Sequence, residues 1–220
     1  MLEKNFITKL HTATKRNYLD RMINEKAECM NEAKKYDMNY WDGDRKYGYG
    51  GYNYIIDRWK PVAENLIKDY KLNNNSKILD VGCGKGFLLY EIKKILPKIE
   101  ISGFDVSSYA IKNSKPEISE YLYIGKADEV YNYEDNYFDL VISLGTLHNL
   151  KLKNLKKSLS EINRVGKSKY IMVESYRSDI ELFNLQCWAL TCQTFLSKEE
   201  WVWILQEFNY SGDYEFIYFS

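Results

Sequence analysis

From residue 77 onward, short apolar runs alternate with segments in which apolar residues recur at helical spacing. Five of these runs have the length and composition of strands: Lys77–Gly82, Glu100–Asp105, Tyr121–Gly125, Phe138–Leu144 and Lys169–Glu174. Between them, the spacing predicts two helices, around residues 88–96 and 152–162. Alternation of this kind predicts an α/β fold with a mainly parallel sheet flanked by helices.

The C-terminal part is predicted to contain one more helix and a final strand. Ser197 and Glu200 have the spacing of a capping box, and an apolar stripe follows them. Asp213–Phe219 has the pattern of a strand. Gln186–Phe195 is a candidate for one further strand.

The N-terminal third has a different pattern. We predict an amphipathic helix over residues 14–36, because apolar residues recur at Leu19, Met22, Ile23, Ala27 and Met30. Trp41–Tyr54 contains four glycines and no helical periodicity, which predicts a loop, and a helix follows from Pro61. We therefore divide the chain into N-terminal helices with a Gly/Tyr-rich lid (residues 1–71) and a core domain (residues 72–220), which form one integrated unit.

Composition narrows the class of protein. Hydrophobic residues make up 45% of the 220 residues and charged residues 28%, as in an ordinary globular protein. No run approaches the roughly 20 apolar residues of a membrane span, and the N-terminus lacks the apolar segment of a secretory signal. The four cysteines form no CxxC pair, so we expect no disulfides, no metal site and a cytoplasmic location. The 31 basic residues balance 31 acidic ones, and we expect no nucleic-acid partner.

The strongest chemical signal follows the first predicted strand. In KILDVGCGKGF, glycines stand at positions 82, 84 and 86, directly before a helix. Glycine is needed where the backbone turns sharply or a ligand comes close, and this end of a first parallel strand usually receives a nucleoside-bearing cofactor. The spacing differs from the GxGxxG of dinucleotide-binding proteins. Asp105 ends the second strand, where a carboxylate either binds both ribose hydroxyls or caps the next helix.

Three segments together resemble the class I S-adenosylmethionine (SAM) dependent methyltransferases. KILDVGCGKGF, GFDVS and FDLVISLGTLHNL are similar to the first, second and fourth motifs of that family, and they occur in its order. The resemblance implies a Rossmann-like fold with SAM as cofactor and S-adenosylhomocysteine (SAH) as product. It places four residues around the amino-acid end of SAM: Asp80, Gly82, Gly84 and Gly86. It assigns the ribose to Asp105 and extends the cofactor site to Val106, Leu144 and Gly145.

The third motif departs from the family pattern. The family usually has Gly-Asp-Ala after its third strand, and that aspartate contacts the adenine amine. This chain has Gly125, Lys126, Ala127 and Asp128 instead. Either Asp128 makes the adenine contact, or backbone groups of Lys126 and Ala127 do. We expect Ala127 and Asp128 to belong to the cofactor site.

The residues expected at the methyl acceptor come from two regions. His148 follows the fourth strand, where related small-molecule enzymes carry a histidine near the acceptor, so it is a candidate general base; the alternative is a histidine that fixes the loop. The lid combines aromatic rings with arginines that match phosphate oxygens. Five lid residues are expected to bind the acceptor: Arg45, Tyr47, Tyr49, Tyr52 and Arg58. The alternative is a loop packed by its own tyrosines.

The outer segments WDGDRKYGYGGYNY, VESY and GDYEFIYF resemble small bacterial methyltransferases often associated with surface-polysaccharide gene clusters. The resemblance implies a small polar acceptor, namely an oxygen of a phosphate-linked, nucleotide-linked or sugar building block for capsule or lipopolysaccharide. Two alternatives stay open: N-methylation of an amino acid, protein or base, and SAM binding without catalysis. We expect no membrane partner, and a homodimer is a further expectation.

Overall fold

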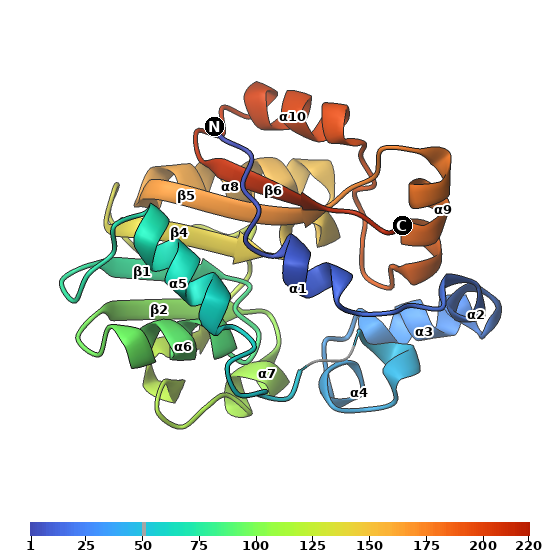
Figure 1. Cartoon of the computed structure of the whole chain (residues 1–220), viewed down its shortest axis with the longest axis horizontal. Helices are drawn as coiled ribbons and strands as arrows, with labels where there is room; N and C mark the ends of the chain where they lie inside the picture. The colour runs from blue at the N-terminus through green and yellow to red at the C-terminus, as the bar shows by residue number, and fades with distance from the viewer. Residues whose placement is uncertain (50–51) are drawn as a thin grey trace.

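The computed structural model describes residues 1–49 and 52–220, and its centre is a six-stranded sheet (Figure 1). The strand order is β3-β2-β1-β4-β5-β6, and every neighbouring pair is parallel. The strands are β1 (Lys77–Val81), β2 (Glu100–Asp105), β3 (Leu122–Ile124), β4 (Phe138–Leu144), β5 (Gly166–Glu174) and β6 (Asp213–Ile217). The predicted Rossmann-like fold is confirmed. The strand order reverses between β1 and β4, the place where such sheets bind ligands.

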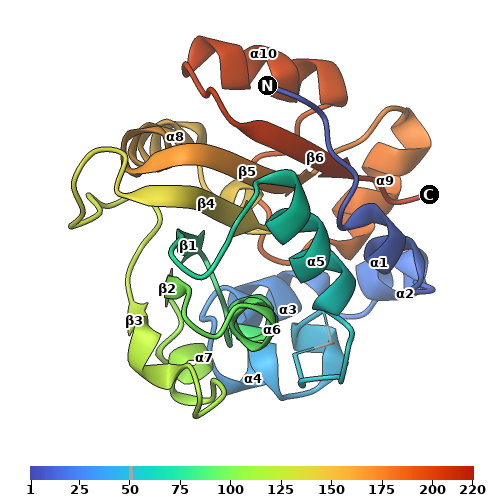
Figure 2. The same ribbon diagram turned by 60° about the vertical axis from the view of Figure 1, so that its left-hand side comes forward.

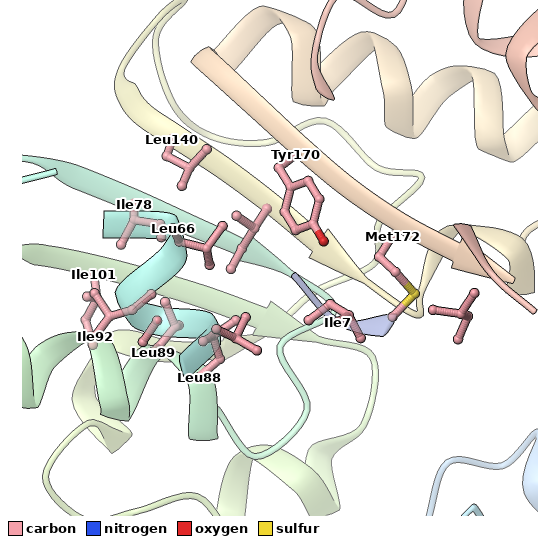
Figure 3. Packing of buried hydrophobic residues seen from close by; sticks show 14 of the residues in the cluster. Ile7, Leu66, Ile78, Leu88, Leu89, Ile92, Ile101, Leu140, Tyr170 and Met172 are labelled. Atoms are coloured by element: carbon pink, nitrogen blue, oxygen red, sulfur yellow. The ribbon is translucent and has the colours of Figure 1, made fainter. Parts of the chain in front are cut away.

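Helices cover both faces of the sheet. Successive side chains of a strand point to opposite faces, so each face presents apolar residues on which helices can pack. On one face, α5 (Lys60–Asp69) and α6 (Phe87–Ile95) pack on strand residues that include Ile78, as Figure 3 shows. On the other face, α8 (Leu152–Val165) and α10 (Lys198–Glu207) pack on residues that include Leu79. Figure 2 shows α5 and α8 on opposite sides of the sheet. The shorter elements of this core are α7 (Ser108–Lys112), η2 (Ser119–Tyr121) and η3 (Leu147–Asn149).

The capping box that opens α10 is confirmed. The Ser197 hydroxyl accepts the N–H of Glu200 at 3.2 Å, and the Glu200 carboxylate accepts the N–H of Ser197 at 2.8 Å. Two otherwise unpaired donors of the first helical turn are thereby satisfied.

The prediction of one helix over residues 14–36 is wrong. The segment forms α2 (Tyr18–Ile23) and α3 (Lys26–Ala33), separated by Glu25 in a left-handed conformation with φ of 48°. Arg21 and Lys26 explain the break, because both reach the end of α9 (Asp179–Trp188). The Arg21 Nε donates to the Trp188 carbonyl at 3.1 Å, and the Lys26 Nζ donates to the Cys187 carbonyl at 2.7 Å. Cations at the C-terminus of a helix stabilise its free carbonyls.

The remaining N-terminal elements are α1 (Thr8–Thr12), α4 (Met38–Trp41) and the short helix η1 (Arg45–Tyr47). Of these, α1 lies close to α9, whereas α4 lies near α7 (Figures 1 and 2). The predicted loop Trp41–Tyr54 therefore contains one short helix, and residues 50–51 of it lie outside the described residues. We call residues 8–49 and 52–58 the cap. The division of the chain at residue 71 stays a prediction.

The edge of β6 is covered by the N-terminal segment. The Lys4 N–H donates to the Tyr214 carbonyl at 2.8 Å, and the Tyr214 N–H donates to the Leu2 carbonyl at 3.1 Å. The buried Glu215 carboxylate then accepts the N–H groups of Phe6, Ile7 and Thr8. The candidate strand Gln186–Phe195 is wrong: its first residues end α9 and the others form no strand. Pairing with the N-terminal segment satisfies the edge of β6 instead.

Candidate active site

The loop between β1 and α6 needs glycine. The backbone is left-handed at Gly82, Gly84 and Gly86, with φ of +82°, +56° and +72°. A Cβ at Gly82 would lie only 2.0 Å from the Thr146 Oγ1. Only glycine combines this conformation with this space. The loop therefore folds tightly enough to bring its backbone against the end of β2.

Asp105 ends β2 and is held in place by that backbone. Its carboxylate accepts the Gly84 N–H at 2.9 Å and the Ser107 N–H at 2.8 Å. Burial raises the pKa of Asp105, and these two hydrogen bonds oppose the increase. The helix cap of α7 is Ser107 itself, whose hydroxyl accepts the Ala110 N–H at 3.0 Å. Asp105 therefore presents a fixed, buried carboxylate at the edge of the sheet.

A cavity of about 490 Å³ begins at Asp105 and runs along the carboxyl ends of the strands. Seven of the residues predicted to bind the cofactor line it: Gly82, Asp105, Val106, Ala127, Asp128, Leu144 and Gly145. Gly84, Gly86 and Asp80 do not line it. A Cβ at Gly84 would meet the Trp41 ring at 2.8 Å, and one at Gly86 would meet Ile118 and Leu122. Burial, together with the charge of Asp105, raises the pKa of Asp80 to about 8.

The two candidates for the adenine contact are placed differently. Lys126 has an exposed side chain whose Nζ donates to the Glu129 carboxylate at 3.1 Å. Both residues line the cavity, where Asp128 is half-buried. The Ala127 carbonyl accepts the Tyr131 hydroxyl at 2.8 Å, which fixes the backbone between them.

The other end of the cavity lies under the cap. Of the five predicted acceptor residues, three line it: Tyr49, Tyr52 and Arg58. Arg45 and Tyr47 do not; Arg45 lines an adjoining hollow of about 420 Å³. Trp41 of the predicted lid lines the main cavity too, and the lining residues that the sequence reasoning did not assign to the site include Arg16, Tyr36, Tyr40, Glu174 and Trp188. Glu174 had a detectable signal, since it ends a predicted strand at the ligand-binding edge.

The cap is tied directly to the glycine loop and to the chain after α9. The Trp41 Nε1 donates to the Ser107 hydroxyl at 2.8 Å, and Asp42 forms an ion pair with the buried Lys85 at 2.7 Å. The Tyr49 hydroxyl accepts the N–H groups of Leu190 and Thr191 at 2.7 and 3.1 Å. The cap therefore contacts the core on both sides of the cavity.

The tyrosines of the cap pack on one another and line the cavity as well. Tyr40 and Tyr52 have ring centroids 5.3 Å apart, and Trp41 and Tyr52 are 4.6 Å apart. Burial raises the pKa of Tyr36 to about 12 and that of Tyr40 well above its ordinary value. Their hydroxyls are thus neutral at physiological pH and can donate hydrogen bonds.

His148 and Glu174 meet in the wall of the cavity. His148, in η3, is buried, and burial lowers its pKa to about 3. Its Nδ1 accepts the Glu174 N–H at 3.3 Å, and its Nε2 lies 3.4 Å from the Glu174 Oε2. Burial raises the pKa of the Glu174 carboxyl to about 7, while the charges of Arg16 and Lys26 oppose the increase.

Two other properties of the described residues bear on the chemistry. No group of three or more His, Cys, Asp or Glu side chains within residues 1–49 and 52–220 is arranged to hold a metal ion. Over the same residues, no helix is long and apolar enough to cross a membrane.

The chain matches known proteins mainly over its core. Residues 72–209 match the family model described as a methyltransferase domain. A stretch of 94 residues is 30% identical to ribosomal RNA small subunit methyltransferase C of Pectobacterium atrosepticum, covering 42% of this chain and 27% of the relative. A stretch of 134 residues is 30% identical to the mitochondrial arginine-hydroxylase NDUFAF5 of Mus musculus, covering 60% of this chain and 35% of the relative. Each of these matches covers about a third or less of the relative's own length.

Solved structures show the same fold at low identity. One similar structure is a Haloferax volcanii complex between the Trm112 methyltransferase activator and a methyltransferase. The matching chain has a TM-score of 0.52 and 17% identity, and the match covers 70% of this chain and 77% of that one. The geranyl diphosphate C-methyltransferase of Streptomyces coelicolor A3(2), solved with SAH, has a TM-score of 0.54 and 11% identity. The match covers 66% of this chain and 58% of that one.

The residues present fit SAM. The cavity offers a buried carboxylate for a diol at Asp105 and aromatic rings for a cation at Tyr36 and Trp41. Gly145 leaves its space open, since a Cβ there would meet only the Met172 Cε at 3.9 Å. Fold and site define a class I SAM-dependent methyltransferase. The chain belongs to the methyltransferase-domain family, whose model covers more than half of it, and SAM is its cofactor.

Proposed function

We propose that this methyltransferase transfers a methyl group to an oxygen of a small polar acceptor enclosed beneath the cap. The observation that carries the proposal is the continuity of the cavity, which runs from Asp105 to Arg16, Arg58 and Glu174. An acceptor under the cap therefore meets the cofactor without crossing solvent. The volume of about 490 Å³ has to hold the cofactor as well, which favours a small acceptor.

The polar lining supports an acceptor that carries hydroxyl or phosphate groups. Arg16 and Arg58 line the cavity, and guanidinium groups match phosphate oxygens in geometry and charge. Tyr52 and Tyr49 bound the same space, although the Tyr49 hydroxyl already bonds the backbone of residues 190–191. In this proposal Arg45 and Tyr47 contact only an acceptor that extends beyond the main cavity.

The predicted cofactor residues keep their proposed roles. The ribose of SAM is assigned to Asp105 and Val106. The adenine is assigned to Ala127 and Asp128. The middle of the cofactor lies at Leu144 and Gly145. The amino-acid end is assigned to Asp80 and the glycine loop, with Gly82 nearest the cavity. Bound SAM supplies an electrophilic methyl group on a sulfonium. Much of the rate then comes from holding the acceptor in line with that methyl group.

Building blocks of capsule or lipopolysaccharide satisfy these requirements and are our proposed substrate class, in a cytoplasmic enzyme. A nitrogen acceptor is the main alternative. Ribosomal RNA, which the name of one relative mentions, is a third acceptor class. An RNA strand is far larger than this cavity of about 490 Å³, which favours the small acceptor.

The test is a transfer assay with SAM labelled in its methyl group. The panel comprises glucose 1-phosphate, UDP-glucose and glycerol 3-phosphate, their unphosphorylated counterparts glucose and glycerol, the amines glycine and arginine, and a ribosomal RNA fragment. We expect label in one or more of the phosphorylated hydroxyl compounds and less in glucose or glycerol. Label confined to the amines or to RNA, or transfer to none of these compounds, would overturn the proposal.

A further inference from the structure

Glu174 brings a buried carboxyl group to the wall of the cavity. It is the last residue of β5, only 9% of its surface is exposed, and it lines the cavity. Its Oε2 is buried and has no hydrogen-bond partner among the described residues. A buried polar atom without a partner is costly, and a catalytic role is one of the explanations for such an atom in a native protein.

The position of His148 determines which group can take a proton. Its Nδ1 accepts the backbone N–H of Glu174, so this nitrogen carries no hydrogen. The proton of the neutral ring is therefore on Nε2, which faces the Glu174 Oε2 at 3.4 Å. With Nδ1 occupied and Nε2 protonated, His148 has no free lone pair for an acceptor proton.

The surroundings of Glu174 bring the pKa of its carboxyl group close to neutral pH. Burial raises its pKa to about 7, against the attraction of two cations. The titratable or charged groups that face it are His148, Arg16, Lys26, Tyr49 and Cys192. Burial lowers the pKa of His148 to about 3 and raises that of Cys192 well above its ordinary value, so neither carries charge at neutral pH. A base with a pKa near the working pH is best suited to proton transfer.

We propose that Glu174 is the general base that takes the hydroxyl proton of the methyl acceptor, and that His148 is a positioning residue that orients the Glu174 carboxylate. This inference rests on the proposed function, because it needs a hydroxyl acceptor. As the new O–CH₃ bond forms, the O–H bond breaks and its proton moves to the Glu174 carboxylate. The electron pair of the broken S–CH₃ bond stays on sulfur, which leaves neutral SAH. Glu174 later returns the proton to solvent.

The first test follows the carboxyl group itself and needs no acceptor. Protein labelled with ¹³C in glutamate side chains is titrated by NMR, as wild type, Glu174→Gln and Glu199→Gln. Glu199 is an exposed residue of α10 and serves as the matched control. We expect one carboxyl signal to titrate near pH 7, to be lost in Glu174→Gln and to persist in Glu199→Gln. Titration of every glutamate below about pH 5 would overturn the proposal.

The second test measures turnover with the best hydroxyl compound of the panel. Glu174→Gln should lower kcat by roughly 10²–10⁴-fold, the usual contribution of a general base, with SAH affinity unchanged. Glu199→Gln should match wild type. His148→Asn should move the acid limb of the kcat–pH profile away from pH 7, which a merely structural histidine would not do. Wild-type rates in Glu174→Gln would overturn the base assignment and leave the proposed function intact.

The two proposals fail separately. A wild-type enzyme that methylates no hydroxyl compound refutes the proposed function. The base assignment then falls with it, because it needs a hydroxyl acceptor, whereas a Glu174 carboxyl at its ordinary pKa or wild-type rates in Glu174→Gln refute the base alone.

Discussion

Replacing Glu174 with glutamine should stabilise the protein at pH 8 and change its stability little at pH 4. The reason is the difference between the folded and unfolded pKa of this carboxyl. Burial raises the pKa from the ordinary value of 4.5 to about 7 in the folded protein. Between pH 4.5 and about 7, Glu174 keeps its proton in the folded protein but releases it in the unfolded chain. The folded state therefore loses stability as the pH rises, and the loss is complete above about pH 7.

The size of the effect follows from the two pKa values. At 1.36 kcal/mol per pH unit, the interval from 4.5 to about 7 corresponds to roughly 3 kcal/mol. Glutamine has nearly the same shape as glutamate and does not ionise. The free energy of unfolding of the variant should therefore not fall in this way as the pH rises. Both histidines are present in both proteins, and burial lowers their folded pKa values to about 3 for His148 and about 4 for His11, below this range.

Urea unfolding followed by tryptophan fluorescence measures this difference. The free energy of unfolding is extrapolated to water for wild type, Glu174→Gln and Glu199→Gln at pH 5 and at pH 8. The advantage of Glu174→Gln over wild type should grow by about 2–3 kcal/mol between these pH values, and Glu199→Gln should show no such growth. An advantage that is equal at both pH values would refute the reasoning, because Glu174 would then have no raised pKa.

Three further outcomes are expected. Asp105→Ala should weaken SAH binding by about 1.5–3 kcal/mol, the range for hydrogen bonds to a charged group. Asp139→Ala is its calorimetric control, since Asp139 accepts the Lys77 N–H at the far end of the sheet. Glu215→Gln should lower the free energy of unfolding by about 2–4 kcal/mol, because the buried charge holds three backbone N–H groups; equal urea midpoints would contradict this. Arg58→Ala should raise the acceptor KM roughly tenfold or more and keep SAH affinity within about twofold, whereas Arg45→Ala, outside the main cavity, should change both little.

The core could be predicted from the sequence because its signals are local. Each strand carries its own apolar run, and the loop at Gly82 needs glycine for reasons confined to a few neighbouring residues. Asp105 could be placed at the cavity because the carboxyl ends of parallel strands meet at one edge. The same rule, applied to the fifth strand, would have pointed to Glu174.

The cap could not be predicted in the same way, since its conformation depends on distant partners. Leu19 and Ile23 have the spacing of a buried stripe, yet both are exposed. The chain turns at Glu25 so that Arg21 and Lys26 can bond the end of α9, more than 160 residues later in the sequence. No local pattern encodes that contact. The separation of Arg58 from Arg45 likewise depends on how the cap folds over the cavity.

Calorimetric titration of the wild-type protein with SAM, SAH and NAD tests the central claim most directly. The glycine loop, the fixed Asp105 carboxylate and the cavity beside them predict saturable binding of SAM and SAH, with no heat from NAD. Saturable binding of NAD, with no heat from either SAM or SAH, would contradict the account.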